Sequence, residues 1–440
     1  MRFRSIHGVA PAVGFREALL QGLAPDGSLY IPETIPPSNA LSFNLGPTLH
    51  LPTVAAGVMT AFIEDPPAAT VQHLAESAFS FPIPLVNLER DLYLLELFHG
   101  PTLAFKDVGA RFMAHTLSYF LEREQRELTI AVATSGDTGS AVAHGFFNVP
   151  RISVFVLYPS GKISLLQEKQ MTTLGGNIHA IEVDGTFDDC QSLVKRALAD
   201  SDLKRTRNLT TANSINLGRL IPQITYYVWG LLLLQKELGV LIRHDDDTAP
   251  IVSVPSGNFG NLTAAVYSKG IGTPIARFIS ATNANDVVPE YFRTGLFRPR
   301  PSIQTFSNAM DVGNPSNFAR LQAFYENNLD AMKHDIVALS ITDRETLEEM
   351  RQTYDRTGHV LDPHTAVATA AARKYRTSHP SSRPTIVMST AHPAKFPDVV
   401  TKALDISLPF PPQLEEAMRR PKQSTTIPAD YARLRQLLLS

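Results

Sequence analysis

The chain has 440 residues, of which 44% are hydrophobic and 19% charged, and its net charge is −2. This is the composition of a globular protein with room for two or three domains, and it excludes disorder over the whole chain. The absence of a basic surplus argues against nucleic acid as a partner. Cys190 is the single cysteine, so neither an internal disulfide nor a zinc site built from thiolates can form.

The same features predict where the protein works. A lone cysteine is typical of a reducing compartment. The start MRFRSIHGVA leads into no apolar segment of signal-peptide length, and the most apolar run, residues 228–234, is too short to span a bilayer. We therefore expect a cytoplasmic protein with no membrane partner.

Predicted elements follow the chain in three stages. Residues 1–80 are rich in proline and indicate a mixed module, whereas short apolar runs alternate with helical patterns from about residue 90, which favours mostly parallel α/β sheets. The predicted strands are 92–98, 129–133, 152–158, 177–183, 251–254, 276–280 and 385–388. The predicted helices are 107–123, 141–147, 162–173, 187–199, 219–238 and 365–375. Residues 284–330 indicate an irregular insertion, and the tail from residue 409 a closing helix.

Loops that follow predicted strands are the candidate sites, because ligands of parallel α/β sheets collect at the carboxyl ends of strands. The segment HGPTLAFKD, residues 99–107, places Lys106 between a strand and a long helix. The positive end of a helix disfavours an ammonium, so a neutral amine able to form a covalent imine is easier to reach there. A surface lysine paired with Asp107 is the simpler alternative on spacing alone.

Four further loops carry polar groups. TSGDTGS, residues 134–140, and PSGNFGN, residues 255–261, could each bind phosphate through free backbone N–H groups, or could simply cap a helix. NSINLGR, residues 213–219, could bind an oxyanion through Arg219, although a helix cap beside an exposed arginine is the simpler interpretation. In STAHPAK, residues 389–395, His392 has no partner at metal-ligand spacing, so we expect a structural histidine and no metal site.

Taken in this order, the five loops closely resemble those of threonine synthase, a fold-type-II family that depends on pyridoxal 5′-phosphate (PLP). HGPTLAFKD is similar to the lysine segment of that family, and ATSGDTGSA, NSINLGRLIPQ, SVPSGNFGN and STAHPAKF match its later motifs. GFREALLQGLAPDGSLYIPE, residues 14–33, is similar to the N-terminal segment of its bacterial and fungal branch. The likeness runs from about residue 5 to residue 404.

The resemblance implies an α/β fold of two domains with mostly parallel twisted sheets and the cofactor in the cleft between them. The implied divisions are an N-terminal module over 1–80, a large PLP-binding domain over 81–106 and 212–405, a small α/β domain over 107–211, and a tail over 406–440. A homodimer or a monomer is expected.

The resemblance also implies site residues. Lys106 would bind PLP covalently and then act as the mobile acid and base, Thr390 would meet the pyridine nitrogen, and the loop that begins at Ser256 would hold the phosphate. The residues implied to hold the cofactor are Lys106, Asp137, Ser256, Gly257, Asn258, Phe259, Gly260, Asn261 and Thr390. Those implied to bind the substrate through its carboxylate or phosphate are Thr134, Ser135, Thr138, Asn213, Ser214 and Arg219.

Two departures from the family pattern stand out. Ser5-Ile6-His7-Gly8 replaces the usual Ser-Thr-Arg-Gly, so a role for an arginine there is not carried over. Asp137 stands where many fold-type-II enzymes place an asparagine near the cofactor O3′, and a carboxylate beside a phenolate needs a shared proton.

The implied reaction converts O-phospho-L-homoserine and water to L-threonine and phosphate by γ-elimination and β-addition. The nearest alternative is a related PLP phospho-lyase that releases 2-oxobutyrate, ammonia and phosphate. A serine or threonine dehydratase and a non-catalytic phosphometabolite-binding protein are further alternatives. The expected partner is the small-molecule substrate.

Overall fold

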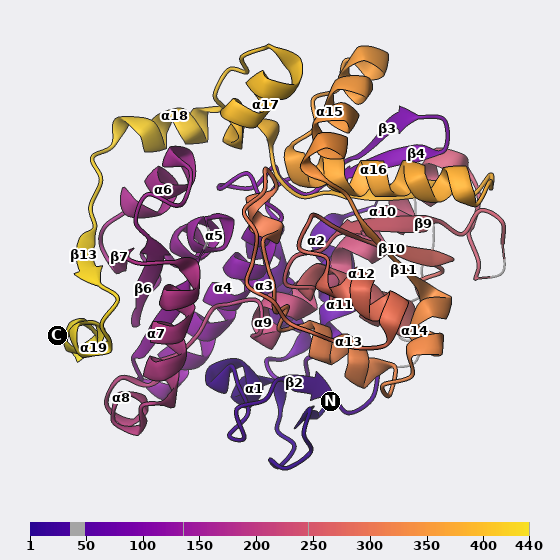
Figure 1. Ribbon diagram of the computed structural model, residues 1–440. Coiled ribbons are helices and arrows are strands. Elements are labelled where there is room, and N and C mark those ends of the chain that lie inside the picture. The colour runs from indigo at the N-terminus through magenta and orange to yellow at the C-terminus, as the bar shows by residue number, and fades with distance from the viewer. Residues whose placement is uncertain (36–48, 135, 245, 440) are drawn as a thin grey trace.

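The computed structural model describes residues 1–35, 49–134, 136–244 and 246–439, and arranges them as three sheets with helices around them (Figure 1). Within these residues the largest sheet has the order β11-β10-β9-β12-β4-β3 and the next has the order β13-β7-β6-β5-β8. Every pairing in both is parallel except that of β3 with β4. The predicted α/β class with mostly parallel sheets is confirmed.

The larger sheet separates two hydrophobic cores. Its strands are β3 (Leu85–Glu89), β4 (Leu92–Glu96), β9 (Ile251–Pro255), β10 (Arg277–Thr282), β11 (Ile336–Ser340) and β12 (Thr385–Ser389). In the central strand β12, Ile386 and Met388 belong to one core and Val387 to the other, as the alternation of side chains along a strand requires. Helix α10 (Ile224–Leu238) packs on the first face at Gly230, and α16 (Pro363–Ser378) covers the second.

The smaller sheet contains β5 (Leu128–Ala133), β6 (Ile152–Pro159), β7 (Ile178–Asp184) and the two-residue β8 (Leu209–Thr210). Its helices include α5 (Asp137–Phe146), α6 (Leu165–Thr172), α7 (Phe187–Ala199) and α8 (Ser201–Arg207). The edge strand β13 (Thr425–Pro428) comes from the tail and pairs with β7, and α19 (Tyr431–Leu439) lies beside α7 and α8 (Figure 1). The tail therefore adds a strand to this sheet as well as the predicted closing helix.

Two predictions about helices were wrong. The predicted helix 219–238 is broken into α9 (Leu217–Leu220), the 3₁₀ turn η2 (Ile221–Gln223) and α10, because Pro222 in the turn has no N–H to continue the bonding. The predicted irregular insertion 284–330 contains α12 (Val287–Thr294), the 3₁₀ turn η3 (Asn308–Met310) and α13 (Phe318–Phe324). Arg320 of α13 is fully buried and donates to Tyr30 O at 2.9 Å, so this segment is part of the body.

The N-terminal module is mixed, as predicted. Strands β1 (Phe3–Ser5) and β2 (Tyr30–Pro32) pair antiparallel, and α1 (Phe15–Gln21), α2 (Leu51–Thr60) and α3 (Ala68–Ala78) accompany them. The other helices are α4 (Lys106–Glu124), α11 (Gly260–Gly270), α14 (Leu329–Asp335), α15 (Asp343–Thr357), α17 (Pro397–Leu404) and α18 (Pro412–Arg419), with the 3₁₀ turn η4 (Pro393–Lys395). Over the described parts of the chain, no helix is both long and apolar enough to cross a membrane.

Candidate active site

The five candidate loops meet around one cavity, which we call the site cavity. They come from the carboxyl ends of β4, β5, β9 and β12 and from the segment after β8, the edge at which parallel sheets bind ligands. The predicted residues that line it are Lys106, Thr134, Asp137, Thr138, Asn213, Ser214, Arg219, Gly257, Asn258, Phe259, Gly260, Asn261 and Thr390. Ser256 is not among them, since its hydroxyl donates to Val254 O at 2.9 Å, and Ser135 lies outside the described residues.

Lys106 is the first residue of α4 and is half-buried. Asp107 does not pair with it, because that carboxylate accepts bonds from the Thr102 N–H at 2.9 Å and the Thr102 hydroxyl at 2.6 Å. Within the described residues, the Lys106 Nζ has no hydrogen-bond or ion-pair partner. Burial lowers the pKa of Lys106 to about 8, although the charge of Asp137 opposes this shift. The alternative of a surface lysine paired with Asp107 is therefore wrong.

The loop after β9 offers a set of free donors. Phe259 adopts φ 61°, a left-handed conformation that turns the chain into α11. In the described part of the chain, the backbone N–H groups of Gly257 to Asn261 donate to no acceptor, and the buried Nδ2 of Asn261 is also without a partner. A Cβ on Gly257 would lie 2.8 Å from Met310 Cα, so only glycine fits this approach. Free donors at a helix N-terminus are suited to a phosphate.

Arg219 is a buried cation without a counter-ion. Its side chain is 2% exposed, its Nη1 donates to Ala212 O at 2.6 Å, and its Nε has no partner. No carboxylate among the described residues lies within ion-pair distance of it. Burial lowers the pKa of Arg219 to about 10. The alternative of an exposed arginine is wrong, and the side chain is available to an anion that enters the cavity.

The neighbours of Arg219 are partly committed to the protein. Ser214 Oγ accepts from Asn258 Nδ2 at 2.6 Å and from Asn317 Nδ2 at 3.3 Å, so its own O–H remains to donate. Asn213 Nδ2 donates to Ala133 O at 3.0 Å, which ties this segment to the end of β5.

The two threonines of the loop after β5 differ in their surroundings. Thr134 Oγ1 accepts from the N–H groups of Gly136 and Gly139 and donates to Gly136 O, so its hydroxyl is used within its own loop. Thr138 lines the cavity half-buried, at the start of α5. Of the two, Thr138 is the one whose side chain is open to a ligand.

Thr390 follows β12 directly. Its carbonyl accepts from the Phe105 N–H at 2.9 Å, and its own N–H donates to Thr365 Oγ1 at 3.3 Å. Its side chain is 5% exposed and lines the cavity, and its hydroxyl bonds to no described residue. The backbone therefore holds Thr390 beside the turn that carries Lys106 and leaves its hydroxyl to the cavity.

Sequence reasoning missed Lys395. This side chain is fully buried, and its Nζ lies 2.7 Å from Oδ1 of Asp137. Burial alone would raise the pKa of Asp137, but the neighbouring positive charges, above all Lys395 and then Lys106, hold it well below its usual range. A buried ammonium therefore balances the charge of this carboxylate. The motif AHPAKF contains this lysine, but nothing in its spacing indicates the contact.

His364 was also missed. Its Nε2 accepts from the Ala309 N–H at 3.2 Å, which requires the proton on Nδ1, where Asp362 Oδ1 accepts it at 2.8 Å. Ala309 and Met310 line the site cavity together with His364. The histidine therefore fixes the loop that lies against Gly257.

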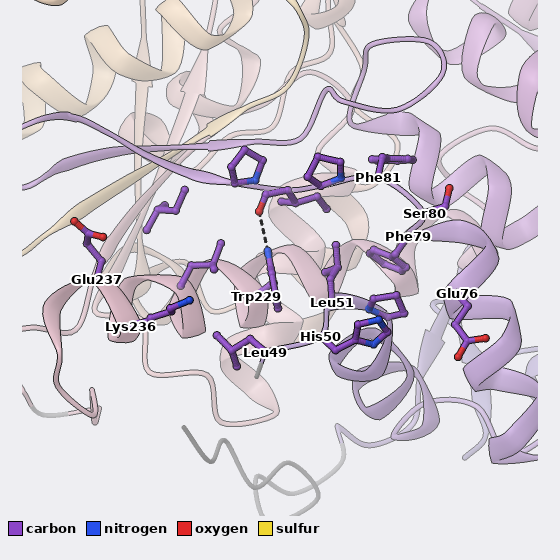
Figure 2. Close-up of a pocket in the computed structure, with 16 residues that line it drawn as sticks. Leu49, His50, Leu51, Glu76, Phe79, Ser80, Phe81, Trp229, Lys236 and Glu237 are labelled. Carbon is purple, nitrogen blue, oxygen red and sulfur yellow. Dashed lines mark hydrogen bonds between the residues drawn. The ribbon is translucent and has the colours of Figure 1, made fainter. Parts of the chain in front are cut away.

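A second hollow lies away from these groups, between α10 and the chain entering β3 (Figure 2). It is lined mainly by apolar and proline side chains, and Trp229 Nε1 donates to Ile83 O at 2.8 Å across it. No predicted site residue lines it. Across the described residues, no three His, Cys, Asp or Glu side chains form a group that could hold a metal ion.

Comparisons with known proteins match the whole chain. The family model for PLP-dependent enzymes matches residues 78–390, that for the threonine synthase N terminus residues 2–79, and that for the threonine synthase C-terminal region residues 365–438. The chain is 43% identical over 430 residues to a threonine synthase of Haemophilus influenzae, with 97% of both chains covered.

Solved structures agree with this match. The threonine synthase of Escherichia coli superposes with a TM-score of 0.89 at 40% identity, covering 100% of this chain and 99% of that one. A PLP-bound threonine synthase from Brucella melitensis superposes with a TM-score of 0.90 at 34% identity, covering 100% and 98%.

Proposed function

This chain belongs to the threonine synthase family of PLP-dependent enzymes, and we propose how its own residues convert O-phospho-L-homoserine and water to L-threonine and phosphate. Its fold is fold type II and its cofactor is PLP. The observation that carries the proposal is a single cavity that contains a lysine of lowered pKa, a loop of free backbone donors and a buried arginine without a counter-ion.

The residues present fit the cofactor. The free N–H groups of Gly257 to Asn261, with the orphaned Asn261 Nδ2, match a phosphate, and the missing side chain of Gly257 lets this loop lie against the Met310 backbone. The open hydroxyl of Thr390 would meet the pyridine nitrogen, and Lys106 would bind the cofactor covalently. When bound, PLP supplies an electron sink for the electron pairs released at the substrate carbons.

Lys106 would be the acid and base of the reaction. A pKa of about 8 leaves a useful fraction of its amine neutral near pH 7, so Nζ can accept the proton of the substrate Cα and return it later. Because Nζ makes no hydrogen bond or ion pair with the described residues and only lies 5.7 Å from the centre of the Phe105 ring, no hydrogen bond must break before it moves. One base that reaches neighbouring carbons in turn is sufficient for the elimination and the addition.

Arg219 and the Ser214 hydroxyl would bind the substrate phosphate, with Asn213 beside them. A guanidinium already desolvated by the protein binds an anion without further loss of hydration, and each charge-assisted bond contributes about 1.5–3 kcal/mol. Thr138 would contact the substrate carboxylate. Thr134 would shape the loop, because its hydroxyl is already satisfied.

Product analysis tests the reaction. The purified protein is incubated with O-phospho-L-homoserine, and phosphate, threonine and 2-oxobutyrate are measured together. Equal release of phosphate and threonine supports the proposal, whereas 2-oxobutyrate and ammonia without threonine would assign the phospho-lyase reaction instead. Borohydride reduction followed by peptide mapping should place the pyridoxyl group on Lys106, and a label on another lysine would reject its role.

We also propose a division of the chain into four parts: 1–80, 81–106 with 212–405, 107–211 and 406–440. We further propose that the protein is cytoplasmic, is a monomer or a homodimer, and has no nucleic-acid partner. The membership of β5 to β8 in one sheet and of β3, β4 and β9 to β12 in another supports the division of the body. The single, buried Cys190 is compatible with a reducing compartment, and the net charge of −2 with the lack of a nucleic-acid partner.

A further inference from the structure

A buried ion pair lies in the wall of the site cavity. Lys395, the last residue of η4, is fully buried. Its Nζ lies 2.7 Å from Oδ1 of Asp137, which is 4% exposed. An isolated charge of either sign would be costly at this depth, and the two opposite charges compensate each other.

The same ammonium also contacts the turn before Lys106. Lys395 Nζ donates to Thr102 O at 2.8 Å. Thr102 in turn donates to the Asp107 carboxylate from both its N–H and its hydroxyl. One side chain from the edge of the larger sheet therefore connects the first residue of α5 with the turn that carries the reactive lysine.

The Asp137 carboxylate is held by one oxygen. Lys395 Nζ pairs with Oδ1, and Gln167 Nε2 donates to the same oxygen at 3.1 Å. Oδ2 accepts no hydrogen bond from the described side chains. Asp137 lines the cavity, so its second oxygen is available to a ligand there.

We propose that Lys395 is a positioning residue of the reaction, whose ammonium keeps Asp137 ionised in the cavity wall and fixes that carboxylate relative to the turn of Lys106. The inference rests on the assignment of the cavity as the cofactor site. Its consequence is electrostatic: an ionised Asp137 stabilises a proton on the Lys106 nitrogen, and a neutral one does not.

Other charges around the pair act on the same proton and must stay unchanged in a test. The charged and titratable side chains near Lys395, Asp137 and Lys106 are Asp107, His144, Arg219, Asp362, His364 and His392. None of them is altered by the variants below.

The test is the pH titration of the visible absorption of the bound cofactor, which reports the proton on the nitrogen that joins Lys106 to it. In Lys395→Met the unpaired buried carboxyl of Asp137 takes up a proton, so the midpoint should fall by about one pH unit or more, as in Asp137→Asn. Lys395→Arg retains the positive charge and should restore most of the shift. The affinity for PLP, measured by equilibrium dialysis, should fall in Lys395→Met and recover in Lys395→Arg.

Several outcomes would overturn the proposal. If Asp137 stayed ionised without Lys395, the loss of a positive charge would raise the midpoint of the absorption titration in Lys395→Met. If Lys395 only tethered the two segments, that midpoint would not change. If Lys395→Met does not fold, the double variant Asp137→Asn/Lys395→Met removes both buried charges, and its midpoint must still fall. A wild-type protein that binds no PLP would refute the proposed function instead.

A surface lysine provides the matched control. Lys422 pairs with Glu168 at 2.6 Å and with Glu182 at 2.7 Å, away from the site cavity. Lys422→Met should leave both the midpoint and the affinity for PLP unchanged. A similar fall in this variant would mean that the shift reports general charge loss, and would overturn the role of Lys395.

Discussion

Replacing Arg219 by methionine should separate the effect of this side chain on the stability of the fold from its effect on substrate binding. Methionine keeps most of the aliphatic volume and removes the guanidinium. The unliganded protein loses one hydrogen bond, that to Ala212 O, which contributes about 1 kcal/mol, and it is relieved of an orphaned buried Nε, which costs about 1–3 kcal/mol. We therefore expect the free energy of unfolding without ligand to stay the same or to rise by up to about 2 kcal/mol.

The same substitution should weaken substrate binding. Each lost charge-assisted bond to the substrate phosphate costs about 1.5–3 kcal/mol, so KM should rise roughly ten- to a hundredfold per bond while PLP remains bound. Arg219→Lys is the control, because it keeps the charge without the planar fork, and its KM should lie between the two.

Two measurements check this reasoning. Steady-state phosphate release gives KM and kcat, and thermal unfolding with inorganic phosphate measures anion binding directly, since a ligand at about 100 times its Kd stabilises by about 2.7 kcal/mol. With PLP bound, so that the loop of Gly257 to Asn261 is already occupied, phosphate should protect the wild type and not Arg219→Met. An unchanged KM with normal cofactor content, equal protection of both proteins, or a loss of several kcal/mol in the unliganded variant would show that Arg219 is a structural residue.

Three further predictions concern other parts of the site. The Lys106 amine releases its proton near pH 8 in the folded protein and near pH 10.5 in the unfolded chain, so between these values the unliganded folded protein binds fewer protons. Its free energy of unfolding should therefore rise with pH in this interval, by at most about 3 kcal/mol. Denaturant titrations should show that Lys106→Met abolishes this contribution. Gly257→Ala forces a Cβ against the Met310 backbone and should lower the affinity for PLP about tenfold or more, measured by dialysis, whereas Gly14→Ala meets nothing within 4 Å and should not. Thr390→Val should keep PLP bound and lower kcat, and turnover equal to that of wild type would make its hydroxyl structural.

Elements with a strong local signal could be predicted from the sequence. Helix α7 begins and ends at the predicted residues, and its start is marked by a capping box of Thr186 and Asp189 before an amphipathic run. Strand β12 is buried along its whole length, and Ile386, Val387 and Met388 make an apolar run in its predicted part. Strand β13 was missed because it has four residues, three of them exposed, ends in Pro428 and pairs with β7 alone.

The site divides in the same way. Its loops could be found because a strand, a polar turn and a helix start follow one another in the sequence. The direction of a side chain within a loop could not be predicted: the structure shows the hydroxyl of Ser256, a residue of the predicted phosphate loop, bonded to Val254 O. The pair of Lys395 and Asp137 joins two segments far apart in the chain, and such a contact depends on how the two sheets sit against each other.

The strand β13 gives the tail a mechanical role. The chain passes from the larger sheet to the smaller one after β4, returns after β8, and passes over again through α17, α18 and β13 (Figure 1). This third passage is fastened, since Lys169 Nζ donates to Arg420 O at 2.9 Å and the Gln423 N–H donates to Thr172 O at 2.7 Å. A rotation of one sheet against the other must therefore bend three covalent connections at once. Sliding of one sheet past the other would likewise have to distort all three connections.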